Sequence, residues 1–209
     1  MRNSQAAHPD LGAVEIHGMT RASFILRGAM TAGAVYGATA VGPFVSNAFA
    51  ATSSTDVDIL NFALTLEYLE TNFYQVKGKA VGLSGEAKSL AALFGSEEHE
   101  HVAALTQAIT NGGGTPVKMP KFDFPVTNEK SFLALAYTLE NVGVGAYNGA
   151  GPSLQNPTLL AAAGSIVQVE ARHAASIALL TGKAVTPTGA FDQALTKATV
   201  LKDAGPLIK

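Results

Sequence analysis

Two stretches of the chain repeat the same arrangement of glutamate and histidine. Glu98 lies 31 residues after Glu67, Glu170 lies 30 residues after Glu140, and each later glutamate is followed three residues on by a histidine. Residues three apart share one face of a helix, so each Glu-x-x-His pair offers a carboxylate and an imidazole one turn apart. The repeated set predicts the ligands of a dinuclear metal site: Glu67, Glu98, His101, Glu140, Glu170 and His173.

The four glutamates lie within apolar stripes that are expected to face a core. Glu67, for example, shares its helical face with Leu60 and Leu64. Burial of an unpaired carboxylate costs several kcal/mol, and four converging carboxylates repel one another. Two divalent cations would balance the four charges and leave two neutral imidazoles as further ligands. The alternative is a bundle in which these acids and histidines only hydrogen-bond one another, without metal.

The donor types indicate which metals fit. The chain has no cysteine, and an oxygen-rich set with two imidazoles suits Fe or Mn better than soft metals. We therefore expect two Fe ions, two Mn ions or a mixed Fe–Mn pair. Glu98 and Glu170 are predicted to be the bridging, catalytic carboxylates. The predicted terminal ligands are Glu67, His101, Glu140 and His173.

Three further residues are weaker candidates. Glu70 follows Glu67 by three residues and could be an extra ligand or a gate, although a solvated helix carboxylate is the favoured interpretation. Tyr74 and Tyr147 could hydrogen-bond near the metals or be ordinary core tyrosines. Two glycines, Gly143 and Gly145, would permit close helix packing or leave space for Glu70 or dioxygen, with packing favoured. The remaining polar residues near the motifs are expected on a solvated surface: Glu97, His99, Glu100 and Arg172.

Four long segments carry helical periodicity and must position these residues. They cover about 56–75, 85–111, 129–148 and 157–181, with a shorter helix expected near 191–202. The seventeen residues 112–128 can span about 55 Å, whereas a twenty-residue helix is about 30 Å long. This linker can therefore cross the whole bundle. The predicted fold is an all-α, ferritin-like four-helix bundle made of two helical hairpins and a short C-terminal helix.

The chain resembles a known family over residues 55–182, including all six predicted ligands. The segments that carry the resemblance are DVDILNFALTLEYLETNFY, EEHEHV and QVEARHAA. They are similar to the exported ferritin-like domain family, which includes desiccation-related and secreted stress proteins and falls within the ferritin-like di-iron carboxylate superfamily. The resemblance implies a closed four-helix bundle with a di-iron or iron–manganese site, and it leaves the reaction open.

The first fifty residues are typical of an export signal. Arg21 and Arg27 precede a weakly hydrophobic stretch, and Ala48-Phe49-Ala50 supplies a cleavage signal. The segment from Thr20 resembles a twin-arginine signal in which Ala22 replaces the second arginine, so both the Tat and the Sec route stay open. We expect an export signal at 1–50 and a mature domain at 51–209, located in the periplasm or secreted. An uncleaved membrane anchor is the alternative; after cleavage no stable membrane span is expected.

The composition of the chain reduces the number of functions that fit it. A net charge of −2 without a long basic run argues against a nucleic-acid partner. The leading expectation is oxidation of Fe(II), or reduction of dioxygen or peroxide, during oxidative or desiccation stress. The alternatives are a metal-binding stress or envelope protein without turnover and a manganese-catalase-like activity; a storage cage is the least favoured. The sequence leaves homo-oligomerisation open.

Overall fold

The computed structural model describes residues 15–16, 19–20 and 52–209. The chain forms two compact units, Met1–Pro43 and Phe44–Lys209. In the first unit, strands β1 (Glu15–Ile16) and β2 (Met19–Thr20) pair antiparallel, with Ile16 opposite Met19. The rest of the predicted export signal, including its cleavage site at 48–50, lies outside the described residues. The boundary between residues 50 and 51 therefore stays a prediction.

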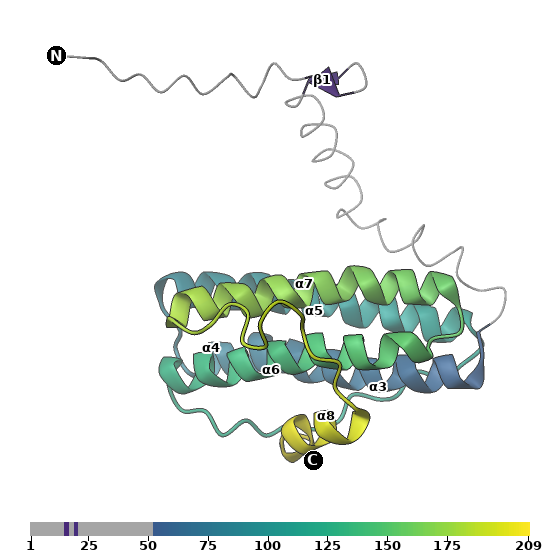
Figure 1. The fold of residues 1–209 in the computed structure, drawn as a ribbon. Coiled ribbons are helices and arrows are strands. Elements are labelled where there is room, and N and C mark those ends of the chain that lie inside the picture. The colour runs from purple at the N-terminus through teal and green to yellow at the C-terminus, as the bar shows by residue number, and fades with distance from the viewer. Residues whose placement is uncertain (1–14, 17–18, 21–51) are drawn as a thin grey trace. The chain divides into compact units, whose positions relative to one another are not determined.

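Four long helices form the second unit, a bundle of two helical hairpins (Figure 1). The first hairpin pairs α3 (Ser54–Asn72) with α5 (Gly85–Asn111), and the second pairs α6 (Glu129–Ala150) with α7 (Pro157–Thr181). Helix α3 continues through a π-helical turn, η2 (Phe73–Lys77), into the short α4 (Gly78–Ala80). A 3₁₀ turn, η3 (Gly151–Ser153), follows α6. The predicted all-α four-helix bundle is confirmed.

Local sequence signals set the helix boundaries. The side chains of Ser53, Asn128 and Asn156 accept hydrogen bonds from backbone N–H groups in the first turns of α3, α6 and α7. Helix α7 ends at Gly182, which adopts the left-handed conformation with φ of 66°. The predicted bounds of α5 and α7 agree with the structure. Helix α3 begins two residues earlier than predicted and passes into the π-helical turn before the predicted end at 75, and α6 ends two residues later than predicted.

The short C-terminal helix begins later than expected. Helix α8 (Lys197–Ala204) starts where the Thr196 side chain accepts a hydrogen bond from Thr199 N, and η4 (Gly205–Leu207) follows it. The predicted start near Phe191 is wrong: this side chain is exposed in a loop. Its apolar character fitted a helical pattern, but the cap five residues later determines where the helix begins.

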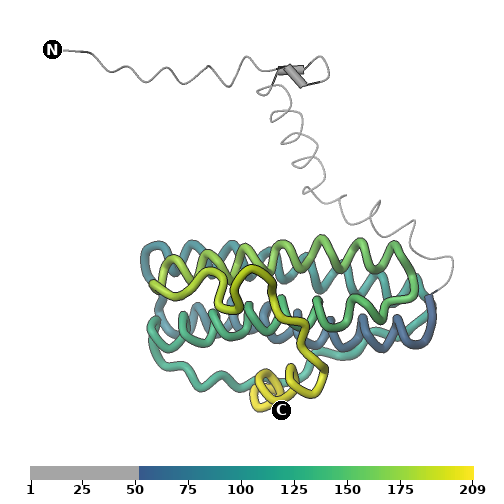
Figure 2. The backbone as a smooth tube through the Cα atoms, viewed as in Figure 1, coloured from purple at the N-terminus to yellow at the C-terminus, as the bar shows by residue number. Residues whose placement is uncertain are grey.

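The linker at 112–128 runs along α3, as a crossover between the hairpins requires (Figure 2). It begins with Gly114 packed against Val57 near the start of α3. Further along, Asn61 in the middle of α3 accepts a hydrogen bond from Val117 N. The linker then reaches the end of that helix, where the rings of Phe124 and Phe73 lie 5.1 Å apart. Because of this crossing, α5 and α6 run in the same direction.

The C-terminal segment packs directly on α6. Leu195 N donates a hydrogen bond of 2.8 Å to Gly145 O. A Cβ atom at Gly149 would lie 1.9 Å from Leu195 O, so only glycine permits this approach. Gly145 also lies against the Leu195 side chain, so it permits close packing, although its neighbour is the non-helical segment before α8 and not another helix. Helix α8 then contributes Val200 and Ala204 to the buried core.

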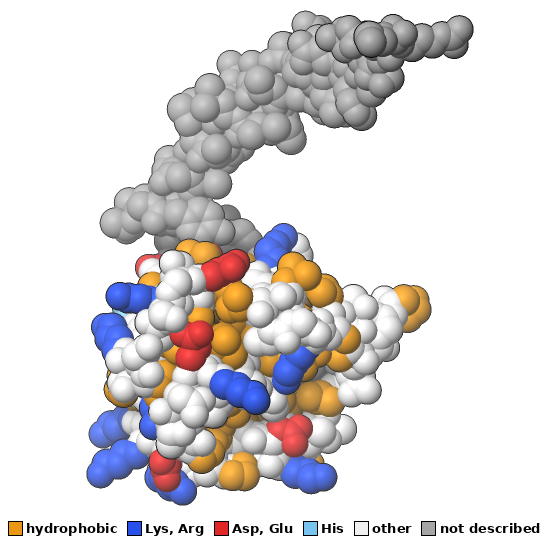
Figure 3. Space-filling view, turned by 90° about the vertical axis from the view of Figure 1, so that its left-hand side faces the viewer, with side chains coloured by type: hydrophobic (Ala, Val, Ile, Leu, Met, Phe, Trp, Pro, Cys, Tyr) orange, Lys and Arg blue, Asp and Glu red, His pale blue; other side chains and the backbone are white. Residues whose placement is uncertain are grey.

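The surface of the bundle is mixed in character. Figure 3 looks onto the end at which α6 begins and α7 ends, where Lys and Arg side chains lie mainly around the edge and hydrophobic side chains are interspersed with polar ones. Within the described part of the chain, every helix is too short or too polar to cross a membrane.

Candidate metal centre

All six predicted ligands meet in the middle of the bundle, where each of the four long helices contributes a glutamate. Helices α5 and α7 each add a histidine one turn further on. The four glutamates are 0 % exposed, and the side chains of His173 and His101 are 2 % and 11 % exposed. The members of this cluster are Glu67, Glu98, His101, Glu140, Glu170 and His173.

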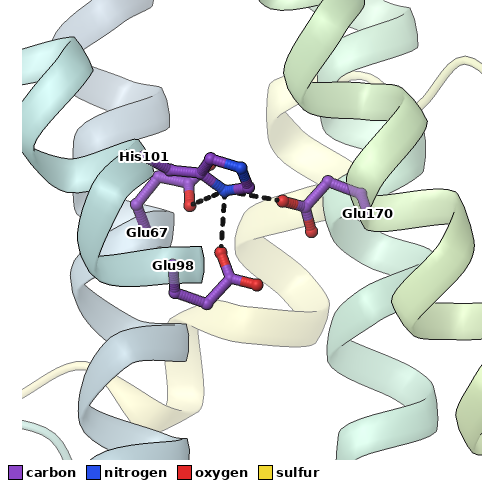
Figure 4. A group of neighbouring side chains, drawn as sticks. All are labelled: Glu67, Glu98, His101 and Glu170. Atoms are coloured by element: carbon purple, nitrogen blue, oxygen red, sulfur yellow. Dashed lines mark hydrogen bonds and ion pairs between the residues drawn. The ribbon is translucent and has the colours of Figure 1, made fainter. Parts of the chain in front are cut away.

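The first ligand group surrounds His101 (Figure 4). Its Nδ1 atom lies 3.2 Å from Glu67 Oε2, 3.0 Å from Glu98 Oε2 and 3.2 Å from Glu170 Oε1. One ligand atom from each of the four residues lies within 4.8 Å of the others. Glu67 comes from α3, Glu98 and His101 come from α5, and Glu170 comes from α7. The group therefore needs these three helices together.

The second ligand group surrounds His173. Its Nδ1 atom lies 2.8 Å from Glu98 Oε1 and 3.4 Å from Glu140 Oε2. Glu170 completes this group, again with one ligand atom from each residue within 4.8 Å of the others. Glu98 and Glu170 therefore belong to both groups, whereas Glu67 and Glu140 belong to one each.

Several buried atoms at the centre lack a hydrogen bond, which is the arrangement expected of metal ligands. Although His173 Nδ1 and Glu98 Oε1 are 2.8 Å apart, neither makes a hydrogen bond of normal geometry. Glu140 Oε2 and both carboxylate oxygens of Glu170 are likewise buried without one. Such atoms are costly to bury unless a further group satisfies them. A carboxylate–imidazole donor set is suited to divalent Fe or Mn, so the residues present fit metal ions.

Without metal, the cluster retains protons. Burial raises the pKa of Glu170 well above its usual range, and the charge of Glu98 raises it further. Burial also raises the pKa of Glu98 to about 7, although both histidines oppose the shift. For His173, burial lowers the pKa, but the carboxylates of Glu140 and Glu98 outweigh it and raise the pKa to about 11. Divalent cations would displace these protons on binding.

An ion pair links Glu67 and His101 in the metal-free cluster. Burial alone would raise the pKa of Glu67, but the adjacent His101 outweighs it and lowers this pKa. Conversely, the pKa of His101 is raised because the attraction of Glu67 and hydrogen bonds to the carboxylates overcome the effect of burial.

Tyr74 and Tyr147, which lie seven residues after Glu67 and Glu140, donate hydrogen bonds to carboxylates across the bundle. Tyr74 of the first hairpin donates a hydrogen bond to Glu140 Oε1 of the second. Tyr147 of the second hairpin donates one to Glu67 Oε1 of the first. Both phenols are buried. Each bond occupies Oε1 and leaves Oε2 of the same carboxylate facing a histidine of the cluster.

Glu70 is part of the buried cluster, so its favoured interpretation as a solvated carboxylate is wrong. Only 3 % of it is exposed, and burial together with the charge of Glu170 raises its pKa well above the usual range. Gly143 leaves room for the Glu70 side chain, because a Cβ atom at this position would lie 3.0 Å from Glu170 Oε2 and 3.3 Å from Glu70 Oε1. The favoured packing role is therefore wrong for Gly143, which accommodates the two carboxylates.

Glu97 contacts a ligand that the sequence did not assign to it. Its Oε2 atom lies 2.8 Å from His173 Nε2, and its side chain is 37 % exposed. This carboxylate can accept a hydrogen bond from Nε2–H, so that the neutral imidazole needed for metal binding would direct its Nδ1 lone pair toward the cluster. The expectation that Glu97 is only a surface residue is wrong. The expectation holds for the three other residues, which are exposed: His99, Glu100 and Arg172.

A four-helix bundle that encloses carboxylates and histidines, with a crossover between its hairpins, defines a ferritin-like protein. The model of the ferritin-like domain family matches residues 55–183, and the chain belongs to this family. A comparison with curated proteins found no match to the chain.

Proposed function

We propose that the bundle binds two divalent metal ions, Fe or Mn, one in each ligand group. The observation that carries this proposal is the sharing of Glu98 and Glu170 by two groups that each contain one histidine. Shared carboxylates can bridge two ions. Glu67 with His101, and Glu140 with His173, would then complete the two ends of the site.

The proposed activity is oxidation of Fe(II) coupled to reduction of dioxygen or peroxide. When bound, two Fe(II) ions supply two electrons, which with two protons convert dioxygen to hydrogen peroxide or hydrogen peroxide to two water molecules. The chain positions the terminal carboxylates for this chemistry. Because Tyr147 and Tyr74 hold the Oε1 atoms of Glu67 and Glu140, each carboxylate presents Oε2 to its end of the site.

Glu70 supplies a nearby proton. It belongs to neither ligand group and is buried beside Glu170, and burial together with the charge of Glu170 raises its pKa well above the usual range, which favours the protonated carboxyl group. A protonated carboxyl group close to the dioxygen or peroxide that is being reduced can act as a general acid. Glu70 would therefore donate a proton rather than serve as a ligand.

The place of action that we propose is outside the cytoplasm. Two sequence features support it: the export signal expected at 1–50, and the resemblance of 55–182 to exported, desiccation-related proteins. A mature bundle in the periplasm or medium would remove Fe(II) and an oxidant together during oxidative or desiccation stress.

The first test is metal content. The full chain is loaded anaerobically with Fe(II) or Mn(II), freed of excess metal and measured by elemental analysis. We expect two ions per chain, and loss of both in Glu98→Ala and Glu170→Ala. Glu100→Ala is the matched control, because this glutamate lies on α5 but is exposed. Retention of two ions in Glu98→Ala, or a folded wild type that stays empty, would contradict the proposal.

The second test separates the candidate reactions. Stopped-flow absorbance follows Fe(III) formation after the Fe(II)-loaded chain is mixed with dioxygen or peroxide. Rapid repeated turnover supports the proposed activity, and a slow, single oxidation supports a metal-binding protein without turnover. Vigorous oxygen release from peroxide by the Mn-loaded chain would instead indicate a catalase-like reaction.

A further inference from the structure

An apolar, partly open cavity lies between the four long helices next to the ligand cluster. Side chains from all four long helices line it, and among the residues that form its wall only Tyr147 has a polar atom in its side chain. Seven of these residues are alanines, whose small side chains leave the space open. Representative members, one from each long helix, are Ala63, Ala104, Tyr147 and Ala163.

The cavity is close to the ligands along the bundle axis. Ala63 precedes Glu67 by four residues on α3, and Ile166 precedes Glu170 by four residues on α7. Four residues correspond to about one helical turn, or about 6 Å along the axis. The wall of the cavity therefore begins one turn from the carboxylates of the first ligand group.

Tyr147 separates the cavity from the first ligand group. Its ring forms part of the wall, while its hydroxyl group donates a hydrogen bond to Glu67 Oε1. The one polar atom of the wall is thus engaged with a predicted ligand. Tyr74, the equivalent residue of the other hairpin, instead lines a cleft that contains Lys79, Lys88 and His99. The two sides of the cluster therefore differ in chemistry.

The size and lining of the cavity select a small apolar occupant. Its volume is about 60 Å³, whereas an apolar protein cavity of about 150 Å³ stays dry and binds benzene or xenon. The space is therefore too small for an aromatic ring but sufficient for a diatomic gas. Hydrogen peroxide is disfavoured there, because its hydroxyl groups would lose their hydrogen bonds to water and find no partners.

We propose that this cavity binds dioxygen and delivers it to the metal centre past Tyr147, so that dioxygen rather than peroxide is the oxidant. This inference rests on the proposed function, since it names the substrate of the same site. It also makes a separate claim about the metal-free chain, namely that the cavity takes up an apolar gas.

Xenon tests that claim without any redox reaction. Crystals of the metal-free full chain are pressurised with xenon, and its position is read from anomalous scattering. We expect xenon between Ala63, Ala163 and Tyr147 in the wild type and none in Ala163→Leu, whose longer side chain fills the cavity. Ala161→Leu is the matched control, because Ala161 lies on the same helix but is exposed. Ala104→Leu provides a second filling variant from another helix.

Oxidation kinetics test the delivery of dioxygen. At limiting dioxygen, we expect Ala163→Leu and Ala104→Leu to oxidise bound Fe(II) about tenfold more slowly than the wild type. A change of a single methylene group in an apolar pocket commonly alters a rate by about tenfold or more. Their metal content and their reaction with peroxide should match those of Ala161→Leu. An unchanged rate with dioxygen in a variant that excludes xenon would overturn the proposal.

The outcomes distinguish this inference from the proposed function. Oxidation by dioxygen in the wild type without xenon in the cavity would overturn the cavity assignment alone. Xenon in the cavity with no oxidation by either oxidant would overturn the proposed redox function, and the assignment of dioxygen with it.

Discussion

At the scale of single residues, the two histidines differ in how they are held. His173 Nε2 lies 2.8 Å from Glu97 Oε2, so a carboxylate holds the orientation of this ring and favours the proton on Nε2. The position equivalent to Glu97 in the other hairpin is Val169, which has no acceptor. The second ligand group is therefore supported from outside in a way that the first is not.

Replacement of Glu97 by alanine should weaken one metal site selectively. Loss of such an outer carboxylate typically lowers metal affinity about 10- to 100-fold, and we expect this loss for the ion held by His173 only. Calorimetric titration with Mn(II) would resolve the two binding steps. Glu100→Ala serves as the control on the same helix. Equal weakening of both steps, or of neither, would refute a specific role for Glu97.

The residue spacing was enough to predict the ligands but not their surroundings. Positions three and four apart placed the glutamates and histidines on inward faces, as the structure has them. Glu97 is adjacent in sequence to Glu98 and therefore points to a different side of α5, where the neighbouring α7 supplies the contact. Glu70 could not be assigned because its burial depends on Gly143 of another helix. Both contacts depend on which helices are neighbours.

At the scale of helices, the glycines of α6 have separate functions. Gly143 faces the carboxylates, whereas Gly145 and Gly149 face the chain after α7. This chain segment lies against the backbone of α6, close enough for Leu195 N to reach the Gly145 carbonyl group. The sequence predicted the long helices and the crossover from periodicity and linker length. It did not indicate the π-helical turn at Phe73–Lys77, because no simple periodicity marks such a turn.

Alanine at Gly149 should destabilise the bundle. The added Cβ atom would lie 1.9 Å from Leu195 O, so the C-terminal segment must move away from α6. We expect a loss of about 1–3 kcal/mol in the free energy of unfolding, measured by urea denaturation of the metal-free chain. Gly164→Ala on α7 is the contrasting variant, since nothing lies within 4 Å of its Cβ position. It should gain up to about 1 kcal/mol, and a similar loss in both variants would disprove the packing argument.

At the scale of the whole molecule, the buried charges couple stability to pH. A group whose pKa is raised by folding stabilises the folded state below its ordinary pKa and loses this contribution as the pH rises through the raised value. For Glu98 this window runs from 4.5 to about 7, and for His173 from 6.5 to about 11. We therefore expect the metal-free bundle to lose stability as the pH rises from mildly acidic to alkaline values.

Metal should reverse this pH dependence. The raised pKa of Glu98 alone, from 4.5 to about 7, corresponds to about 3 kcal/mol lost by the metal-free chain above pH 7. Metal ions bind the deprotonated ligands, so their stabilising effect grows as the pH rises. Thermal unfolding from pH 5 to pH 9, with chelator or with Mn(II), would show opposite slopes. A metal-free chain whose melting temperature rises across this range would contradict the account.

The crossed tyrosine bonds have a consequence for how such a bundle can arise. Neither hairpin can orient its own terminal glutamate, because Tyr74 serves Glu140 and Tyr147 serves Glu67. A single hairpin with one glutamate, one Glu-x-x-His and one tyrosine could nevertheless build the complete site as a two-fold symmetric homodimer, in which each copy supplies the tyrosine of the other. A linker such as 112–128 could join two such copies into one chain, in which positions 97 and 169 need no longer hold the same residue. A hairpin expressed alone should for the same reason bind metal only after it associates with a second hairpin, either its own copy or the other half of the chain.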